Sequence, residues 1–386
     1  MSDSPVKEFT RRGFISKVGQ SLVVANVAGT FLKRAAAQEP LIVPDAPGKK
    51  LGWAVVGLGE LSIYEILPAF AECEKSKLVA LVSGHPDKAN KLAARYGVNP
   101  KNIYNYQNYD SIRDNPEVDV IYIVLPNGMH AEYTIRGFQA GKNVLTEKPM
   151  ASTPAECQQM IDAGRKAGKK LMVAYRCQYD PFTREAIRIV RSGELGPTQV
   201  IVADAGWNAT DPNQWRLKKD LAGGGSMMDI GIYALNAARY FSGEEPIEVN
   251  SMMFNQPGDP RFKEVEETVN FQMRFPSGAM ANCTSSYGYY HQSHYRVIGT
   301  KGHLEMDPGT WYRGNHMHRQ YNVGDQEITA GIDIPERNHF TLEMDHLSDC
   351  VMQNKEPLTP GEEGLRDIKL IMAIYEAAKI GKTVKV

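Results

Sequence analysis

Apolar and polar residues follow a repeating order between residues 51 and 174, where short apolar runs alternate with helix-like segments. The apolar runs predict strands at 51–56, 78–83, 118–125, 143–146 and 170–174. Between them, apolar residues recur at helical spacing and predict helices at 87–96, 130–140 and 154–167, the last capped by Ser152 or Thr153. Such alternation with apolar strands predicts a parallel sheet covered by helices on both faces.

From Gln178 onward the pattern changes to longer segments in which polar and apolar residues alternate. These segments predict strands at 198–205, 248–254, 267–275, 278–287 and 294–299. They indicate an open, mainly antiparallel sheet with one exposed face, interrupted by a helix at about 225–241. Two final amphipathic helices, at 338–353 and 362–380, are expected to pack near the first domain. The fold class is therefore a Rossmann domain followed by a domain with a large open β-sheet.

The first 38 residues differ in kind from the rest. They contain a twin-arginine pattern at Arg11 and Arg12, a mildly apolar stretch, and an A-x-A site that ends at Ala37. This order predicts a twin-arginine export signal that is removed after export to the periplasm, and no membrane association after cleavage. The alternative is an amphipathic N-terminal helix of the mature fold. Residues 39–50 are proline-rich and predict an extended arm.

Length and composition limit the number of domains, the class of partner and the state of the cysteines. The 386 residues predict two domains, a dinucleotide-binding domain at 51–175 and a substrate and oligomerisation domain at 176–386. A net charge of −1 without a basic patch excludes nucleic acid as the expected partner. The five cysteines are odd in number and lack CxxC spacing, so we expect free thiols and no metal site.

A glycine motif follows the first predicted strand and carries the first sign of function. Gly57-Leu58-Gly59 stands between a strand and a helix, as in the first turn of a dinucleotide-binding fold. Gly57 would allow a tight turn, Gly59 would allow a pyrophosphate to approach the backbone, and Ser62 replaces the usual third glycine. An ordinary strand-to-helix turn is the alternative.

The end of the second strand bears on which cofactor is bound. An NAD site usually offers an acidic residue there to the ribose hydroxyl, but this chain has Ser83, Gly84 and His85, followed by Lys88. A hydroxyl, an open glycine and a cation suit the 2′-phosphate of NADP. The alternative is a neutral loop with a solvated lysine.

Two further segments offer groups for proton transfer. Glu147-Lys148-Pro149 closes the strand at 143–146, at the sheet edge where ligands bind. Asp229 and Tyr233 are four residues apart on the predicted helix at 225–241, so their side chains share a face. An ammonium near the tyrosine would favour the phenolate and lower its pKa. The alternatives are a surface lysine, a capping Asp229 and a core Tyr233.

At these motifs the chain resembles the glucose–fructose oxidoreductase group of the Gfo/Idh/MocA oxidoreductases. The resemblance covers nearly the whole mature chain and rests on VGLG at 56–59, LVSG at 81–84, LPN at 125–127, EKPMA at 147–151, YRCQYDP at 175–181, QWRL at 214–217, AGGGSMMDIGIY at 222–233, GEEPIEV at 243–249 and PGEEG at 360–364. Many members of this family have a histidine where this chain has Tyr233. The tyrosine favours the branch that transfers hydride between sugars.

The resemblance implies a tightly bound NADP and a sugar site. The implied catalytic residues are Lys148, Asp229 and Tyr233. The implied cofactor-binding residues are Gly57, Leu58, Gly59, Ser83, Gly84, Lys88, Pro126, Asn127, His130, Glu147, Lys148, Arg176, Trp215 and Arg216. It also implies a homo-oligomer that forms through the open sheet. The arm at 39–50 is much shorter than in the glucose–fructose enzyme, so a second aldose could replace fructose as the acceptor.

The expected compartment leads to the same function. An exported dehydrogenase has no expected pool of NADP, so it can turn over only if a second substrate regenerates its cofactor in place. One aldose would be oxidised at C1 to a lactone, and a second sugar would be reduced to an alditol in the same pocket by ping-pong kinetics. Two alternatives stay open: an NAD-dependent glycoside hydrolase of the same superfamily, and a non-enzymatic sugar-binding protein.

Overall fold

The computed structural model describes residues 48–386. The predicted export signal at 1–38 and most of the arm at 39–50 lie outside the described residues. The strands are β1 (Leu51–Val56), β2 (Ser76–Val82), β3 (Ile103–Tyr104), β4 (Val120–Ile123), β5 (Asn143–Glu147), β6 (Leu171–Ala174), β7 (Thr198–Gly206), β8 (Glu248–Phe254), β9 (Thr268–Arg274), β10 (Met280–Ser286), β11 (Gln292–Gly299), β12 (Gly302–Met306), β13 (Met317–Val323), β14 (Gln326–Gly331) and β15 (Val384–Lys385).

Helices connect these strands. The α-helices are α2 (Leu67–Ala69), α3 (Pro86–Tyr96), α4 (His130–Gln139), α5 (Pro154–Ala167), α6 (Pro181–Arg191), α7 (Lys219–Ala222), α8 (Ile232–Ser242), α9 (His339–Gln353) and α10 (Gly361–Ile380). The short π and 3₁₀ segments are η1 (Ser62–Ile66), η2 (Pro100–Asn102), η3 (Tyr109–Asp114), η4 (Asn127–Met129), η5 (Arg176–Gln178), η6 (Trp215–Leu217), η7 (Met227–Gly231) and η8 (Pro260–Phe262). None of the described helices combines the length and the apolar character that crossing a bilayer requires.

The first sheet is the parallel sheet that the sequence predicts. Its strand order is β3-β2-β1-β4-β5-β6, and all its strand pairs are parallel. The order reverses between β1 and β4, and in such sheets ligands bind at the carboxyl ends of the strands beside this reversal. The Rossmann part of the predicted fold class is confirmed.

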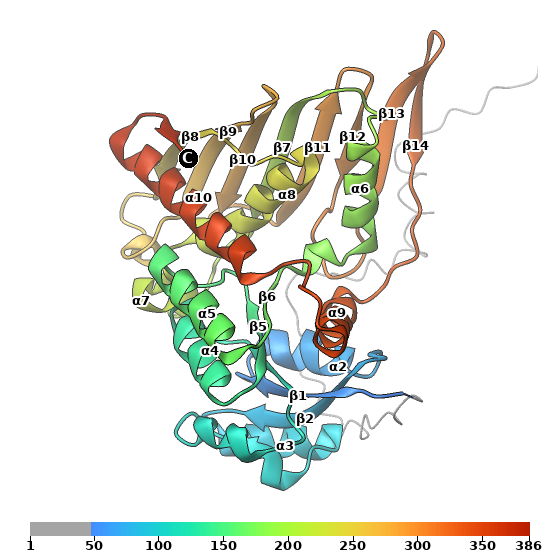
Figure 1. Cartoon of the computed structure of the whole chain (residues 1–386). Helices are drawn as coiled ribbons and strands as arrows, with labels where there is room; N and C mark the ends of the chain where they lie inside the picture. Colours follow the sequence, from blue (N-terminus) through green and yellow to red (C-terminus); the bar gives the residue numbers. More distant parts are fainter. Residues whose placement is uncertain (1–47) are drawn as a thin grey trace, which may run out of the picture. The chain divides into compact units, whose positions relative to one another are not determined.

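Helix α9, which comes late in the chain, completes the core of this first sheet (Figure 1). Phe340, Met344 and Leu347 of α9 are buried in one cluster with Trp53 of β1. The Trp53 indole also donates a hydrogen bond to Ser348 Oγ at 3.0 Å. The predicted position of this helix near the first domain is therefore confirmed.

The segment that joins α9 to α10 also belongs to the first sheet. Val173 N, on β6, donates to Thr359 O at 2.9 Å, and Met172 forms an isolated bridge with Pro360. The outer edge of β6 is thus paired with residues that lie almost 190 positions later in the chain. An edge strand covered in this way is protected from pairing with other chains.

The second sheet has nine strands in the order β14-β13-β12-β11-β7-β10-β9-β8-β15. Its strand pairs are antiparallel except β7 with β10. Helices α6, α8 and α10 lie over one face of this sheet (Figure 1). The mainly antiparallel open sheet is also confirmed.

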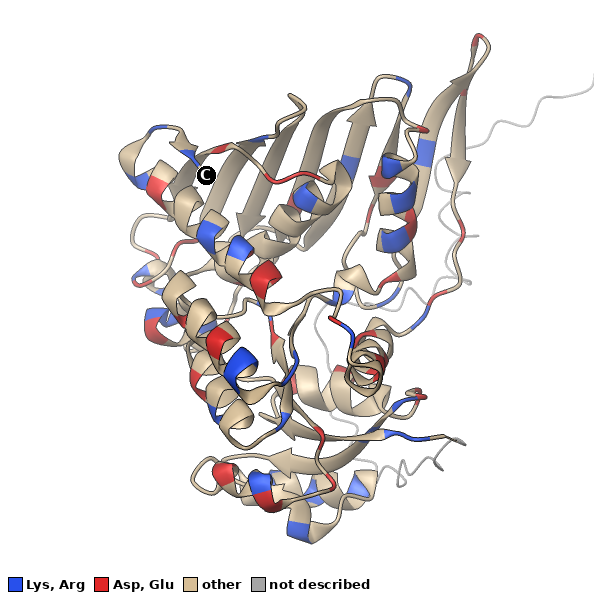
Figure 2. Ribbon diagram, viewed as in Figure 1, with Lys and Arg blue, Asp and Glu red and all other residues tan. Residues whose placement is uncertain are grey.

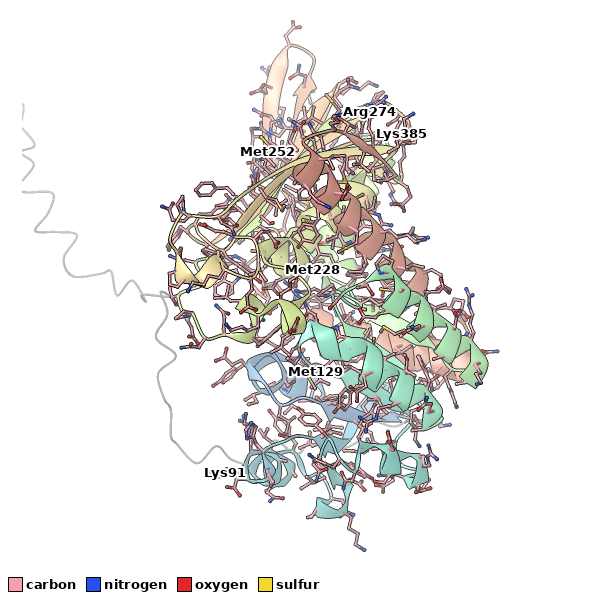
Figure 3. The ribbon with its side chains drawn as sticks, turned by 90° about the vertical axis from the view of Figure 1, so that its left-hand side faces the viewer. Lys91, Met129, Met228, Met252, Arg274 and Lys385 are labelled. Atoms are coloured by element: carbon pink, nitrogen blue, oxygen red, sulfur yellow. The ribbon has the colours of Figure 1, made fainter. Side chains whose placement is uncertain are left out.

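Strand alternation separates the two faces of the second sheet. Along β9, Val269, Phe271 and Met273 are buried, whereas the residues between them are exposed. Across the outer face, Met252 of β8 is in register with Asn270, Thr284, Asp204 and His294 of the next four strands, and Figure 3 labels Met252 at this part of the sheet. The expected pairing of two copies through this face stays a prediction.

Helix α6 and strands β12 to β14 are among the elements of the C-terminal region that were not predicted, and one predicted helix differs in detail. Helix α6 follows Asp180, whose carboxylate caps it by accepting from the backbone N–H groups of Phe182 and Thr183. Strands β12 to β14 are short or exposed, so their alternation is weak in the sequence. The predicted helix at 225–241 consists of the π-helical turn η7 followed by α8.

A buried ionic network joins α8 to α10. Arg239, whose side chain is 2% exposed, contacts Asp367 and Glu363 of α10 and also Glu245. Asn236 donates a further hydrogen bond to Asp367 at 2.6 Å. Elsewhere, Figure 2 shows basic and acidic residues interspersed along the described helices, which agrees with the net charge of −1.

Candidate active site

The glycine motif forms a tight turn directly after β1. Gly57 has φ of +92°, and a Cβ there would lie 2.2 Å from Val124 O, so only glycine is accommodated. At Gly59, in contrast, no atom lies within 4 Å of an added Cβ, and the backbone is open to a ligand. Ser62 is fully buried and donates to Gly57 O at 2.5 Å, which fixes the turn against η1. This open turn at the start of a helix fits a pyrophosphate.

Lys88 lies beside the glycine turn. Its Nζ donates to Leu58 O at 3.2 Å from the first turn of α3. Ser83 is buried at the end of β2, and its Oγ accepts a hydrogen bond from His85 N at 3.1 Å. Gly84 is exposed between them. The structure thus brings Ser83 and Lys88 to the edge of the glycine turn, where Lys88 presents a cation.

Two of the predicted cofactor residues hold backbone segments together. Asn127 Nδ2 donates to Ala222 O at 2.8 Å and so ties η4, which begins after Pro126, to the end of α7. His130 is fully buried, and its ring nitrogens lie 2.8 Å from Leu125 O and from Pro149 O. Burial lowers the pKa of His130, although both carbonyls oppose this shift. These hydrogen bonds fix the backbone around the site. That Asn127 and His130 also contact the cofactor stays a prediction.

Glu147 takes part in a buried pair of carboxyl groups. Tyr122 OH lies 2.6 Å from Glu147 Oε1 and 3.2 Å from Glu343 Oε1, but it can donate only one hydrogen. Burial raises the pKa of both carboxyl groups, and the proximity of Glu147 raises that of Glu343 further. Glu343 comes from α9, 196 residues after Glu147, and sequence patterns gave no sign of it.

Asp229 is the centre of the predicted catalytic group. Its carboxylate accepts from Arg216 Nε at 3.0 Å, from Tyr287 OH at 2.9 Å and from Lys148 Nζ at 3.3 Å. Lys148 Nζ also donates to the backbone O of Asp229 at 2.6 Å. Tyr287, from the end of the second sheet, is a partner that sequence reasoning missed.

These cations keep Asp229 ionised. Burial alone would raise the pKa of Asp229, but Arg216 and then Lys148 outweigh burial and lower the pKa to about 2. The ionised carboxylate therefore contributes stability that is fully present above its ordinary pKa and is lost as the pH falls towards 2. At neutral pH Asp229 can accept hydrogen bonds but has no proton to give.

Tyr233 lies against two cations. Lys148 Nζ is 4.9 Å from the centre of its ring, and Arg176 Cζ is 5.0 Å from it. Burial raises the pKa of Tyr233 above its ordinary value, and Arg176 is the main group that opposes this shift. The expected lowering of this pKa by lysine is therefore wrong for the described structure. Lys148 is engaged by Asp229, and the phenol keeps its proton at neutral pH.

Arg176 connects this group to a neighbouring cavity. Its Nη2 donates to Thr310 O at 2.6 Å, and its Cζ lies 4.6 Å from the ring centre of Tyr312. Tyr312 lines a cavity of about 210 Å³, together with Glu65, His339 and other polar and aromatic residues. His339 is 2% exposed, and neither of its ring nitrogens has a protein partner.

Trp215 and Arg216 stack on each other beside Asp229, with Arg216 Cζ 4.6 Å from the Trp215 ring and Arg216 Nε 3.0 Å from the Asp229 carboxylate. Glu266, which the sequence did not single out, supports the backbone at the start of η7. Its carboxylate accepts from Gly225 N at 2.7 Å and from Met227 N at 3.0 Å, just before the turn that carries Asp229. Glu266 thereby fixes the start of η7 and the direction of Asp229.

In the described part of the chain, the two π-helical turns are η1 and η7. One follows the glycine turn and the other carries Asp229, and π-helical turns often mark functional sites. The structure therefore brings Lys148, Asp229, Arg216, Tyr233 and Arg176 into one cluster, and it places the glycine turn, Ser83 and Lys88 together at the carboxyl edge of the first sheet.

The chain is similar to several known sugar oxidoreductases. The crystal structure of an aldose–aldose oxidoreductase from Caulobacter crescentus complexed with glycerol is 48% identical, covers 88% of this chain and 100% of that chain, and superposes with a TM-score of 0.85. A D-xylose 1-dehydrogenase [NADP(+)] from Haloarcula marismortui is 29% identical over 342 residues, which are 86% of this chain and 92% of that protein.

A D-glucoside 3-dehydrogenase from Escherichia coli is 26% identical over 357 residues, which are 86% of this chain and 96% of that protein. Residues 51–175 match the Gfo/Idh/MocA oxidoreductase family with an NAD-binding Rossmann fold, and residues 183–305 match the C-terminal domain of that family. The chain therefore belongs to the Gfo/Idh/MocA family of oxidoreductases.

Proposed function

We propose that the protein is a sugar oxidoreductase that retains NADP(H), oxidises an aldose at C1 to an aldonolactone and reduces a second sugar to an alditol. The observation that carries this proposal is the cluster of Lys148, Asp229, Arg216 and Tyr233 beside an open glycine turn. The 48% identity to an aldose–aldose oxidoreductase over that protein's whole length supports it. The related xylose and glucoside dehydrogenases support a sugar as the substrate.

The residues of the glycine turn fit the cofactor. The open backbone at Gly59 and the N-terminus of η1 would hold the pyrophosphate, while Ser83 and Lys88 would face the 2′-phosphate. Trp215 and Arg216 would contact the cofactor on the side opposite the glycine turn. When bound, NADP(H) supplies the acceptor and donor of hydride.

The cluster supplies proton transfer and charge stabilisation. Tyr233 takes the proton from the C1 hydroxyl during oxidation and returns a proton to the carbonyl oxygen of the second sugar during reduction. The Lys148 ammonium stabilises negative charge that develops on that oxygen. Asp229 stays ionised, anchors Lys148 and Arg216, and accepts a hydrogen bond from a neighbouring sugar hydroxyl.

The cavity lined by Tyr312 and His339 is linked to this cluster by Arg176, which contacts the rings of both Tyr233 and Tyr312. Sugars present several hydroxyl groups and an apolar ring face, and the cavity offers both charged and aromatic walls. The buried nitrogens of His339 and the Nε and Nη1 of Arg176 have no protein partner, so hydroxyl groups of a substrate can satisfy them. These groups support a polyhydroxyl substrate.

One experiment tests the proposed function directly. The purified protein is denatured, the released nucleotide is identified, and the native protein is separately assayed, without added cofactor, with pairs of aldoses and with a glycoside. We expect NADP(H) in the supernatant, and a lactone and an alditol in equal amounts. Product formation that requires added nucleotide would contradict retention of the cofactor, and hydrolysis of a glycoside without net oxidation would instead support the glycoside hydrolase.

Charge reversal at Lys88 tests the choice of cofactor. In the Lys88→Glu variant we expect NADP to bind at least about tenfold more weakly, with a much smaller effect on NAD, because only NADP carries the additional phosphate charge. Lys91→Glu is the matched control, since Lys91 lies on the same helix α3 and is exposed (Figure 3). Equal losses for NADP and NAD, or equal effects of both variants, would contradict a phosphate contact by Lys88.

We further propose that the twin-arginine signal exports the folded protein with its cofactor to the periplasm. Replacing Arg11 and Arg12 together with lysine should leave active, uncleaved enzyme in the cytoplasm, because the lysine pair keeps the charge but loses the arginine pattern. Cell fractionation with the sugar-pair assay measures this. Unimpaired export of the double variant would contradict export of the folded, cofactor-loaded protein by the twin-arginine route.

A further inference from the structure

Three side chains that can ligate a metal meet on the outer face of the nine-stranded sheet. They are His303 and Glu305 of β12 and His318 of β13, and one ligand atom from each lies within 4.8 Å of the other two. Residues i and i+2 of a strand point to the same face, and Glu305 is directly opposite His318 in the strand register. The backbone of two paired strands therefore holds all three side chains on one face.

Their spacing already approaches that of a coordination shell. Glu305 Oε2 lies 3.4 Å from His318 Nε2. Ligand atoms bound about 2.0–2.2 Å from a tetrahedral zinc ion lie roughly 3.3–3.6 Å from each other. Two of the three ligands thus need no large movement, and a rotation of the His303 side chain closes the set.

A neighbouring histidine on β11 orients the carboxylate of Glu305. Its second oxygen, Oε1, lies 2.8 Å from His294 Nε2 on β11, and His294 Nδ1 is in turn 3.6 Å from Asp204 Oδ2 on β7. One oxygen is therefore held while the other faces His318. Support of a ligating carboxylate by a further hydrogen-bonding group is a general feature of metal sites.

We propose that His303, Glu305 and His318 bind one divalent transition-metal ion of the zinc class. Imidazole and carboxylate ligands favour zinc over magnesium or calcium, which prefer oxygen ligands alone. The fourth position is open to water. The spacing of the cysteines led us to expect no metal site in this chain. The proposed site contains no cysteine, and strand pairing, not a sequence motif, brings its ligands together.

The proposed metal site is separate from the catalytic cluster. Tyr295 of β11 points to the covered face of the sheet, where its OH donates to Tyr233 O at 3.2 Å. His294 and Arg296, its neighbours in the strand, point to the opposite face. Binding of zinc therefore leaves the sugar reaction unchanged and clamps β12 to β13.

Arg296 provides an internal competitor for the metal. Its Nη2 lies 3.3 Å from His303 Nε2, so a bound cation must displace the guanidinium. Removing this positive charge in Arg296→Gln should strengthen zinc binding. A purely structural role of Arg296 in the sheet would not produce this gain.

The test uses the full chain, stripped of metal with a chelator and titrated with zinc chloride by isothermal calorimetry. We expect one zinc ion per chain, and we expect His318→Gln and Glu305→Gln each to weaken binding by at least about tenfold, the loss that even a supporting residue typically causes. His316→Gln is the matched control, because His316 is exposed just before β13 and lies outside the cluster. Titration with cobalt should give the visible absorption of a four-coordinate ion in the wild type and not in His318→Gln.

The sugar-pair assay accompanies the titration and should give the same rate for wild type and His318→Gln. Fewer than one zinc ion per chain in the wild type would overturn the proposal. Equal zinc affinity in the wild type and His318→Gln would also overturn it, as would competition by equimolar magnesium.

Discussion

Replacing Tyr233 with phenylalanine is expected to slow both half-reactions by about a hundred- to ten-thousand-fold, the usual contribution of general acid–base catalysis. The ring stays between Lys148 and Arg176, whose charged groups lie 4.9 and 5.0 Å from its centre, so the fold and the bound nucleotide should survive. Stopped-flow absorbance of the bound nicotinamide, with one sugar at a time, measures each half-reaction separately.

Tyr321→Phe is the matched control for this variant. Tyr321 on β13 also has an arginine over its ring, with Arg319 Cζ 4.8 Å from the centre, but it lies outside the catalytic cluster. Its rates should equal those of the wild type. If Tyr233→Phe reduced sugars at nearly the wild-type rate, the proton would have to come from another group, and the role assigned to Tyr233 would be wrong.

Because the pKa of Tyr233 is raised, the rates of the two half-reactions should depend differently on pH. A phenol that keeps its proton at neutral pH is ready to donate during reduction, but it must lose that proton to act as a base during oxidation. Oxidation should therefore accelerate by about tenfold per pH unit below the pKa of the phenol, while reduction stays nearly flat. The slope of the oxidative half-reaction should disappear in Tyr233→Phe.

Replacing Arg239 with methionine is expected to lower the free energy of unfolding by about 3–5 kcal/mol, because removing one partner of a buried ion pair leaves an uncompensated charge. Arg239 is 2% exposed, and its partner Asp367 on α10 is fully buried. Burial raises the pKa of Asp367, and Arg239 is the main group that opposes this shift. Without Arg239, Asp367 and Glu363 would face each other with no nearby buried cation. Urea unfolding followed by fluorescence measures the change.

The Arg366→Met variant tests whether burial of the arginine, and not only its charge, determines the loss of stability. Arg366 also contacts Glu363, but its side chain is 49% exposed, and exposed ion pairs contribute only about 0–1 kcal/mol. Arg239→Lys, which keeps the charge in a smaller group, should fall between the two methionine variants. Equal losses for Arg239→Met and Arg366→Met would show that the buried network is not what stabilises this helix pair.

The sequence predicts the first domain well because local signals agree there. Apolar strands, helical periodicity and glycine turns point to the same parallel sheet, and α5 begins at Pro154 after the predicted Thr153 cap. In the second domain these signals weaken. No residue of strand β14 is buried, and its half-buried residues are only Ile328 and Ala330, so the apolar alternation that identifies a strand is weak there.

The candidate site was predictable only where its residues lie in motifs. Lys148 and Asp229 stand in recognisable strings, and the structure joins them. Tyr287, Glu266 and Glu343 are isolated polar residues in ordinary strands, loops and helices, and they join the site through tertiary contacts across many residues. Sequence periodicity contains no information on such pairings.

The dependence of the first sheet on α9 has a consequence for how the protein is made. A ribosome adds about 5–20 residues per second, and domains usually fold as they emerge. Here β6 ends at Ala174, but its edge partner Thr359 and the helix that covers Trp53 come more than 160 residues later. For roughly 10–30 s the nascent nucleotide-binding half exposes its unfinished core. Chaperones, or early capture of the nucleotide itself, would protect the growing chain during that interval.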